Sequence, residues 1–323
     1  MTVLAYRFSA FGDVAMTVPV IREILEQNPG LSIIFLSREN FADLFQDLPN
    51  LTFKGVDIEQ YKGFFGLRRL QKELVAEFNP DCIADLHNVI RTKILTKIFR
   101  RKGFKVEVID KGKSEKEHLT NVWNIEKKPL KHTTERYADV FRSLGFHISL
   151  SHQYRTSNIV KEGIGFAPFA QHEGKMMPLE KSLEIVRILA KNHKVYFFGG
   201  GKSEVEILNT WQTQVPNTEN LAGKLSLKEE LSKISSLKTM ISMDSANMHL
   251  ASLVGTRCIS VWGQTHHYAG FLGYGQSTDD IVQVKDLSCR PCSVFGDKQC
   301  YRGDWACLEE IDIQQVISKT LNL

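Results

Sequence analysis

Two short segments place an acidic residue next to small residues, directly before a pattern of apolar residues typical of a helix. The first is Arg7-Phe8-Ser9-Ala10-Phe11-Gly12-Asp13, which follows an apolar stretch near the N-terminus. Gly12 permits a tight turn there. Asp13 has two open interpretations: an N-cap whose carboxylate accepts backbone N–H groups, or a general base at the mouth of a cleft. Strong capping would lower the pKa of the carboxyl group and weaken it as a base.

The second segment is Ile241-Ser242-Met243-Asp244-Ser245-Ala246-Asn247-Met248-His249, in which an expected strand runs through small polar residues into a helix. Unpaired N–H groups at the start of such a helix form an anion site that suits phosphate. Asp244 and Ser245 are equally suited to be helix caps. His249 is either part of that site or a buried structural histidine.

Two further loops could bind phosphate or ribose. Lys175, in the loop over 167–178, could reach a diphosphate as a point charge, or be an exposed lysine. The run Gly199-Gly200-Gly201-Lys202-Ser203-Glu204 fits neither common glycine-rich motif. A P-loop would need glycine at the position of Tyr196, and a dinucleotide fingerprint would need it at Glu204. Glu204 could accept a hydrogen bond from a ribose hydroxyl or simply favour a helix N-terminus.

The third group is a cluster of four cysteines near the end of the chain. Their spacing is C-x2-C-x7-C-x6-C, and they are Cys289, Cys292, Cys300 and Cys307. Four cysteines could bind zinc tetrahedrally, but the second C-x-x-C of a zinc ribbon is missing. The alternative is four free thiols in a loop.

The elements that must position these residues alternate between strand and helix. In the first half we expect strands over 3–8, 32–36, 82–86 and 105–109, and helices over 14–27, 65–78, 89–99 and 135–144. The second half repeats this with strands over 163–167, 194–198, 239–243 and 257–261, and helices over 179–192, 203–212, 227–235 and 247–254. Such alternation predicts parallel sheets covered on both faces. A polar stretch over 149–161 is the best linker.

Length and composition agree with this picture. The chain has 323 residues, of which 42% are apolar and 24% charged. That composition excludes disorder, collagen-like repeats and coiled coil, and the length suggests two domains. No apolar run approaches the 18 or so residues that span a bilayer. The first eight residues lack the basic segment and cleavage site of a signal peptide, so we expect a cytoplasmic protein.

The charge is small overall but unevenly distributed. The formal net charge is +4. Residues 1–155 hold 24 Lys and Arg against 19 Asp and Glu, whereas residues 156–323 hold 17 against 18. Within 91–131 there are 13 basic and 5 acidic residues. Such an excess attracts an anionic ligand or surface, or is a solvated helix face.

Together the motifs resemble those of glycosyltransferase family 9, the ADP-heptose:lipopolysaccharide heptosyltransferases. The resemblance rests on R-F-S-A-F-G-D, the loop from Lys175 to Pro178, D-S-A-N-M-H, and the later Gly255-Thr256 and Gly263-Gln264-Thr265. It also extends to His132…Glu135-Arg136-Tyr137 and the cysteine-rich loop. It implies a GT-B architecture, in which two Rossmann-like, doubly wound α/β domains face a cleft. We therefore expect an acceptor domain over 1–155 and a donor domain over 156–323. A C-terminal helix over 311–323 is expected to pack back on the first domain.

The resemblance also implies roles for individual residues. Asp13 would deprotonate the acceptor hydroxyl and Lys175 would stabilise the donor diphosphate. The other implied donor-binding residues are Glu204 at the ribose, Leu225 at the base, and Asp244, Ser245, Ala246, His249, Gly263 and Thr265. The implied acceptor-binding residues are His132, Arg136, Arg91 and Lys93. The reaction would invert the anomeric centre with no cofactor required.

The implied substrates are a nucleotide sugar such as ADP-heptose and an anionic lipid A or inner-core acceptor at the inner membrane. We expect a monomer that binds no nucleic acid. The chain departs from the family pattern on the donor side, where Ala246-Asn247 replace Gly-Pro and His266-His267 replace Asp-Pro. Two alternatives are a nucleotide-dependent oxidoreductase, disfavoured by the missing dinucleotide fingerprint, and a non-catalytic, zinc-stabilised binding module.

Overall fold

The computed structural model describes residues 1–155 and 159–322, and these form two compact units. The first unit comprises Met1–Gly112 and His132–Ser151, and the second comprises Lys113–Lys131 and His152–Leu323. The chain therefore crosses between the units three times. The linker predicted over 149–161 and the boundary at 155/156 include residues 156–158, which lie outside the described residues.

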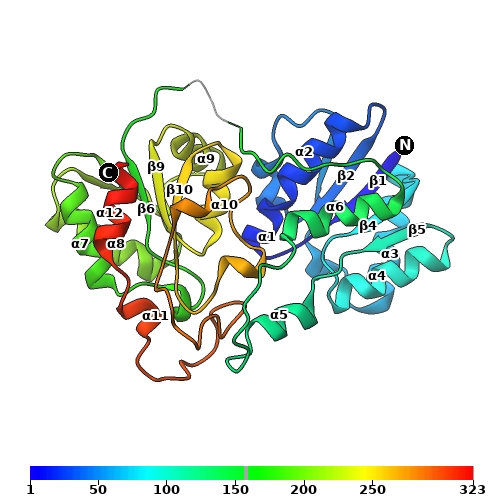
Figure 1. Cartoon of the computed structure of the whole chain (residues 1–323). Coiled ribbons are helices and arrows are strands. Elements are labelled where there is room, and N and C mark those ends of the chain that lie inside the picture. The colour runs from blue at the N-terminus through cyan, green and yellow to red at the C-terminus, as the bar shows by residue number, and fades with distance from the viewer. Residues whose placement is uncertain (156–158, 323) are drawn as a thin grey trace. The chain divides into compact units, whose positions relative to one another are not determined.

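In the described residues, the first unit contains a five-stranded parallel sheet in the order β3-β2-β1-β4-β5. Its strands are β1 (Thr2–Tyr6), β2 (Ser32–Ser37), β3 (Leu51–Gly55), β4 (Cys82–Asp85) and β5 (Lys105–Val108). Its helices are α1 (Phe11–Ala15), α2 (Thr17–Gln27), α3 (Gly63–Phe78), α4 (Ile90–Arg101) and α6 (Thr133–Leu144), with 3-10 turns η1 (Glu39–Phe45) and η2 (Ile58–Gln60). The leucines of α3 and the apolar face of α4 pack on one face of this sheet. Helices α2 and α6 pack against each other on the other face (Figure 1).

The described part of the second unit contains a six-stranded parallel sheet in the order β11-β10-β9-β6-β7-β8. Its strands are β6 (Ile164–Ala167), β7 (Val195–Phe197), β8 (Thr218–Asn220), β9 (Thr239–Met243), β10 (Arg257–Trp262) and β11 (Ile281–Gln283). Its helices are α5 (Lys113–Leu119), α7 (Leu179–Leu189), α8 (Lys202–Gln214), α9 (Leu227–Ser235), α10 (Ala246–Leu253), α11 (Ala306–Glu309) and α12 (Ile313–Leu321), with η3 (Glu173–Lys175), η4 (His267–Ala269) and η5 (Thr278–Asp280). Both sheets have the Rossmann-type strand order, which confirms the predicted fold class.

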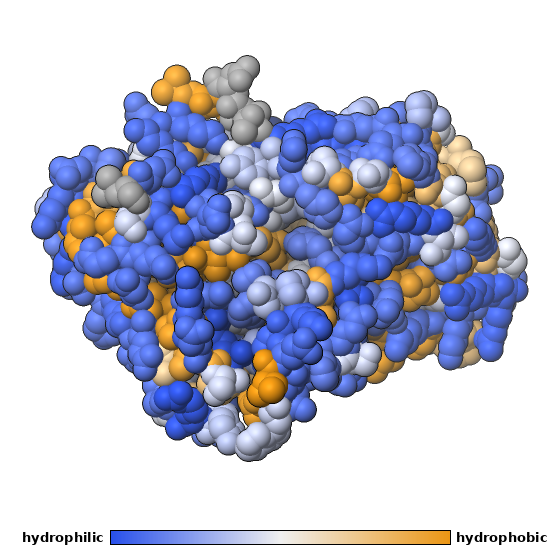
Figure 2. All heavy atoms as spheres, viewed as in Figure 1, coloured by the Kyte–Doolittle hydropathy of each residue, from blue (hydrophilic) through white to orange (hydrophobic). Residues whose placement is uncertain are grey.

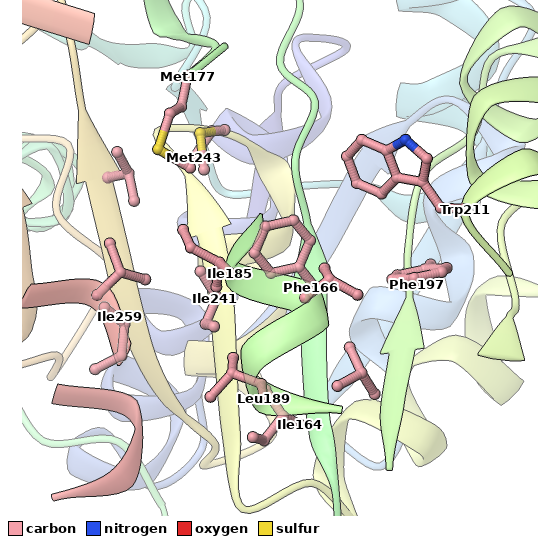
Figure 3. Close-up of a cluster of buried hydrophobic side chains, with 14 of the residues drawn as sticks. Ile164, Phe166, Met177, Ile185, Leu189, Phe197, Trp211, Ile241, Met243 and Ile259 are labelled. Carbon is pink, nitrogen blue, oxygen red and sulfur yellow. The ribbon is translucent and has the colours of Figure 1, made fainter. Parts of the chain in front are cut away.

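The core of the second unit explains why its strands are apolar throughout. Parallel strands between two helical layers are buried on both faces, so they need not alternate in polarity. Figure 3 shows strand residues of β6, β7, β9 and β10 meeting α7 and α8, and its labelled side chains are Ile164, Phe166, Met177, Ile185, Leu189, Phe197, Trp211, Ile241, Met243 and Ile259. This core holds the carboxyl ends of β6 and β9 in fixed register.

Two elements differ from the sequence expectations. The helix predicted over 14–27 begins earlier and is divided at Met16 into α1 and α2. The C-terminal helix was expected to pack back on the first domain, but α12 packs on α7 and β10 of the second unit, and residue 323 lies outside the described residues. The reason is that Val316 and Ile317 are buried in the apolar core of that unit.

The segment Lys113–Lys131 also differs from the expectation, because the structure groups it with the second unit. The Leu130 N–H donates to the Tyr268 carbonyl at 2.8 Å. The Lys116 ammonium lies 4.2 Å from the centre of the Phe271 ring, within cation–π range. Part of the basic region over 91–131 is thereby assigned to the second unit.

The surface in Figure 2 is predominantly hydrophilic, with smaller apolar areas between the charged groups. Among the described helices, none is both long and apolar enough to cross a bilayer.

Candidate functional site

The first unit brings charged side chains together where its strand order reverses, between β1 and β4. Ligands of open α/β sheets bind outside the carboxyl ends of the strands at such a switch point. Asp13 lies in α1, just after β1, and His87 lies just after β4. Register pairing of Tyr6 with Asp85 places the ends of the two strands side by side.

Asp13 is held by a buried arginine from the same segment. Arg7 Nη2 lies 2.6 Å from Asp13 Oδ2, and the side chains are 6% and 28% exposed, respectively. Arg7 also donates through Nη1 to the Leu86 carbonyl at 2.6 Å. The ion pair favours the ionised carboxylate, while the exposed part of Asp13 can meet a ligand.

The N-cap interpretation of Asp13 is wrong. Ala10 is the N-cap of α1, and Asp13 is the third helical residue. Asp13 Oδ2 accepts a hydrogen bond from the Ala10 N–H at 3.3 Å, which is one half of a capping box. The other half is missing, because alanine has no side-chain acceptor for the Asp13 N–H. The Tyr137 hydroxyl donates to the Asp13 carbonyl at 3.2 Å, so α6 also helps to fix this turn.

The turn after β4 is organised by a buried carboxylate. Asp85 Oδ1 accepts from the backbone N–H groups of His87 at 2.9 Å and Asn88 at 2.8 Å, and Oδ2 accepts from the Thr96 hydroxyl at 3.1 Å. This turn aims the His87 imidazole at the segment after β1, where Nε2 lies 3.3 Å from Ser9 Oγ. Burial, together with the charges of Arg7 and Lys111, lowers the pKa of His87 to about 3. The imidazole is therefore neutral at physiological pH.

Further cations surround this switch point. The pKa of Lys111 is lowered, first by burial and then by repulsion from Arg7. The negative charge of Asp13 opposes this shift without reversing it. Arg136, predicted at the acceptor site, is buried on α6 with its guanidinium stacked close against Gly112. A side chain at Gly112 would clash, since an added Cβ would lie 2.4 Å from the Arg136 guanidinium carbon. A glycine is thus required beside Lys111.

The other predicted acceptor residues occupy more peripheral positions. His132 is the N-cap of α6, and its Nδ1 accepts from the Thr134 N–H at 3.3 Å. Arg91 forms an ion pair with Glu59 at 2.8 Å. Lys93 is exposed on α4, yet its charge reaches Lys111 and helps to lower the pKa of that lysine.

The second unit has the equivalent arrangement at its own switch point, between β6 and β9. Lys175 comes from the loop after β6 and Asp244 directly follows β9. Lys175 Nζ lies 2.9 Å from Asp244 Oδ2, with both side chains largely buried. The Thr265 hydroxyl, after β10, donates to the same oxygen at 2.8 Å. Three predicted donor residues from three separate segments therefore meet at one carboxylate oxygen.

Close backbone approach joins the Lys175 loop to the segments around Gly263 and Gly296. The Gln264 N–H donates to the Gly174 carbonyl at 2.8 Å, and the Gly174 N–H donates to the Gly296 carbonyl at 3.2 Å. An added Cβ on Gly263 would lie 2.2 Å from Leu308 Cδ2 and 2.8 Å from the Gly174 carbonyl oxygen. Gly263, another predicted donor residue, is thus required for packing under the Lys175 loop.

Helix α10 begins beside this cluster. Ser245 is its N-cap without a side-chain capping bond, and Ser245 Oγ lies 3.1 Å from Ser242 Oγ. Ala246 is the first helical residue, and His249 is buried one turn further on. The first-turn N–H groups have no intrahelical acceptors and can bind an anion.

Among the described residues, the hydrogen bonds and ion pairs of the Lys175–Asp244–Thr265 cluster do not include Glu204 or Leu225. Glu204 Oε2 accepts from the N–H groups of Gly200 at 2.8 Å and Gly201 at 3.4 Å, so it stabilises the turn before α8. Leu225 is half-buried and precedes Ser226, the N-cap of α9.

A buried arginine that the sequence motifs did not predict, Arg290, supports the turn after β10. Arg290 donates to the carbonyls of Trp262 at 3.1 Å and Thr265 at 2.9 Å, and also to the Gly263 carbonyl. Within the described residues Arg290 forms no ion pair with a carboxylate, and burial lowers its pKa to about 10. The sequence marks only its position, inside the C-x-x-C motif from Cys289 to Cys292, and gives no sign of its backbone partners.

The four cysteines over 289–307 line one cavity of about 10 Å³ together with Arg290. All four are free thiols, and Cys307 is buried. Burial, and then the charge of Cys289, raises the pKa of Cys292. In the part of the chain that the structure describes, no group of three or more His, Cys, Asp or Glu side chains is arranged to hold a metal ion.

Two parallel α/β units of this topology, each with charged residues at its switch point, are the two domains that the GT-B fold of glycosyltransferases requires. Comparison with known families is consistent with this class. The chain belongs to glycosyltransferase family 9 (heptosyltransferase), whose family model matches residues 67–301. It is therefore a glycosyltransferase, as the motifs predicted.

Individual relatives align with this chain over nearly its whole length. The chain is 22% identical to the lipooligosaccharide heptosyltransferase 2 of Campylobacter jejuni, and the alignment covers 97% of this chain and 95% of the relative. It is 23% identical to the lipopolysaccharide core heptosyltransferase OpsX of Haemophilus influenzae, covering 98% and 95%.

Among solved structures, the ADP-heptose lps heptosyltransferase II of E. coli superimposes with a TM-score of 0.70 at 19% identity, covering 100% of this chain and 98% of that one. E. coli heptosyltransferase WaaC with ADP-2-deoxy-2-fluoro heptose gives a TM-score of 0.64 at 20% identity, covering 82% and 90%. These likenesses show the fold. The comparisons give no support to the oxidoreductase or to the non-catalytic binding module.

Proposed function

We propose that this chain transfers a heptose from an ADP-heptose-like nucleotide sugar to an anionic lipopolysaccharide inner-core acceptor, with inversion at the anomeric carbon. The observation that carries the proposal is the Arg7–Asp13 pair, an arginine-bound and partly exposed carboxylate at a switch point. Family membership supplies the class of reaction, and the relatives named for heptose transfer supply the sugar.

Binding of the nucleotide sugar is proposed for the second unit. The WaaC structure was solved with an ADP-heptose analogue, and the E. coli relative is named for ADP-heptose. In this chain, Lys175 and the N–H groups at the start of α10 supply positive charge beside Asp244. A diphosphate that engages Lys175 and these N–H groups would have its developing charge stabilised as the leaving group departs. We also propose that Glu204 contacts the ribose of the donor and that Leu225 contacts its base.

Binding of the acceptor is proposed for the first unit. Lys111, Arg136, His132, Arg91 and Lys93 supply the cations for its acidic groups. In the reaction, the acceptor oxygen forms a bond to the anomeric carbon as its proton moves to Asp13. The bond between that carbon and the diphosphate oxygen breaks, and ADP leaves with the electron pair. Arg7 holds the Asp13 carboxylate in place for this role as a base.

We propose that this chemistry needs no metal cofactor, because Lys175 and the helix N–H groups provide the charge that a divalent ion would otherwise supply. Turnover should then survive saturating EDTA, and its loss with recovery on adding Mg²⁺ would contradict this part of the proposal. We further propose a monomeric enzyme that works at the cytoplasmic face of the inner membrane, where a lipid-linked acceptor is found.

The test is a donor screen with the purified chain, read as the mass shift of an inner-core lipid acceptor. Addition of one heptose from ADP-heptose supports the proposal, and transfer only from another nucleotide sugar contradicts the donor assignment. Asp13→Ala and the similarly shaped Asp13→Asn should both lose transfer by about 100-fold or more while ADP still binds. Normal turnover in either variant would disprove the base assignment.

A further inference from the structure

Three large apolar side chains are exposed at the starts of the neighbouring helices α3 and α4 in the first unit. Phe64 is 43% exposed, Phe65 is 80% exposed and Ile90 is 81% exposed. Single exposed hydrophobic residues are common and need no explanation. Here, however, two adjacent aromatic residues and a β-branched residue begin two helices that pack against each other. Such grouping is what marks an interaction surface.

An ion pair joins the two helix starts. Arg91, next to Ile90, bonds bidentately to Glu59, with Nη1 at 2.8 Å and Nη2 at 3.3 Å. Glu59 lies in η2, shortly before the start of α3. Its pKa is lowered chiefly by the Arg91 hydrogen bonds and further by the charge of Lys62. The segment leading to Phe64 is therefore held near Ile90.

On the exposed faces of α3 and α4, basic residues follow the apolar ones along each helix. On α4, Ile90, Lys93, Lys97 and Arg101 recur at helical spacing and are exposed, whereas Leu95 and its neighbours point into the core. No acidic residue occurs in α4. The face is thus apolar at the helix start and cationic along its length.

Helix α3 repeats the pattern. Arg68 and Lys72 follow Phe64 at intervals of four residues and are exposed. Its two acidic residues are already paired, Glu73 with Arg69 at 3.6 Å and Glu77 with Lys54 at 2.8 Å. The unbalanced charge of this face is consequently positive.

We propose that this surface, formed by Phe64, Phe65 and Ile90 with the cations of α3 and α4, docks on an anionic lipid bilayer. Aromatic and aliphatic side chains would enter the headgroup region while Lys and Arg side chains meet anionic headgroups. The positive charge of α3 and α4 favours an anionic lipid surface as the binding partner. An apolar protein groove is disfavoured, because it would offer no negative charge to these Lys and Arg side chains. The inference rests on the proposed function, in which this unit receives a lipid-linked acceptor.

Vesicle co-sedimentation of the full chain tests the proposal. The wild-type protein should bind vesicles of phosphatidylethanolamine and phosphatidylglycerol, and bind pure phosphatidylcholine at least tenfold more weakly, because each Lys or Arg near an anionic surface contributes about fivefold. The variant Phe64→Ser/Phe65→Ser/Ile90→Ser should lose at least tenfold in binding. Lys93→Gln/Lys97→Gln should lose the preference for anionic vesicles.

Ile125→Ser is the matched control, because Ile125 is 96% exposed in the second unit. It should bind vesicles like the wild type. Equal binding by the triple variant, equal loss in Ile125→Ser, or no difference between the two vesicle types would each overturn the proposal. Thermal unfolding confirms that each variant is folded.

Activity on a water-soluble, deacylated acceptor separates this inference from the proposed function. The triple variant should keep the wild-type kcat/KM on that acceptor and lose activity only on acceptor embedded in vesicles. If the wild-type protein transfers no heptose to either acceptor, the proposed function fails, while the co-sedimentation result still decides the docking surface. If the triple variant loses activity equally on both acceptors, the residues act in the site, and the docking assignment is wrong.

Discussion

Lys175 Nζ and Asp244 Oδ2 lie 2.9 Å apart, which joins the segments that follow the two central strands of the second sheet. Neither residue is near the other in sequence. The pair forms because β6 and β9 are neighbours at the point where the strand order reverses. Asp244 thereby holds in place Lys175, the lysine that we propose binds the diphosphate. Asp244 is in turn fixed by the hydrogen bond from Thr265.

Removing the lysine charge should abolish most of the activity. We expect Lys175→Met to lower kcat by about 100-fold or more, since a preorganised charge on a leaving group contributes on that scale. The loss should be read from steady-state kinetics of heptose transfer. Lys202→Met is the matched control, because Lys202 is an exposed lysine at the start of α8. Similar kinetics in the two variants would contradict the role of Lys175.

Adding one methyl group to Gly263 should be destabilising. The Cβ of Gly263→Ala would overlap Leu308 and the Gly174 carbonyl, and overpacking of this kind costs about 1–3 kcal/mol. We expect a lower melting temperature together with a raised KM for the donor, because the Lys175 loop must shift. Gly200→Ala is the control, since nothing lies within 4 Å of a Cβ added there. A wild-type KM in Gly263→Ala would show that the loop position is not limiting.

Loss of the Arg290 guanidinium should destabilise the turn after β10 and thereby weaken donor binding. Arg290→Met leaves the carbonyls of Trp262, Gly263 and Thr265 without their donor, at about 1–3 kcal/mol for each buried group left unsatisfied. We expect a folded but less stable protein whose donor KM rises. Arg290→Lys should recover only part of the loss, because an ammonium group lacks the planar fork that reaches several acceptors. Unchanged denaturant unfolding in Arg290→Met would refute the supporting role.

Protonation of His87 should make folding of the first unit sensitive to acid. Its pKa is about 3 in the folded protein, below the usual value of 6.5. The unfolded chain therefore binds the proton more tightly. The stabilisation is fully present above pH 6.5 and is lost as the pH falls towards 3, at up to about 1.4 kcal/mol per pH unit.

His87→Gln should remove this contribution. The difference in unfolding free energy between the wild type and the variant, measured in denaturant from pH 7.5 to pH 5, should shrink below pH 6.5. A constant difference across that range would show that the imidazole is not held neutral in the folded protein.

Much of the fold could be predicted because it follows from local patterns. Strands such as β9 and helices such as α9 were predicted with their observed bounds, since apolar runs and the Ser226 cap are visible in the sequence. The short strands β8 and β11 were missed. Thr218–Asn220 is polar and gains strand geometry only by pairing with β7. Helix α5 was missed because its sequence has almost no apolar periodicity.

The sequence by itself determined two α/β halves, the residues that end the central strands, and the family to which they belong. The tertiary structure decided which of these residues meet. Asp13 and Arg7 are close in sequence, yet His87 and Lys111 join them only through the sheet order. Arg290 was identified only from the structure, because its partners are backbone carbonyls, which leave no mark on residue type. Parallel sheets bring distant strand ends to one edge, and that adjacency is a property of topology rather than of local sequence.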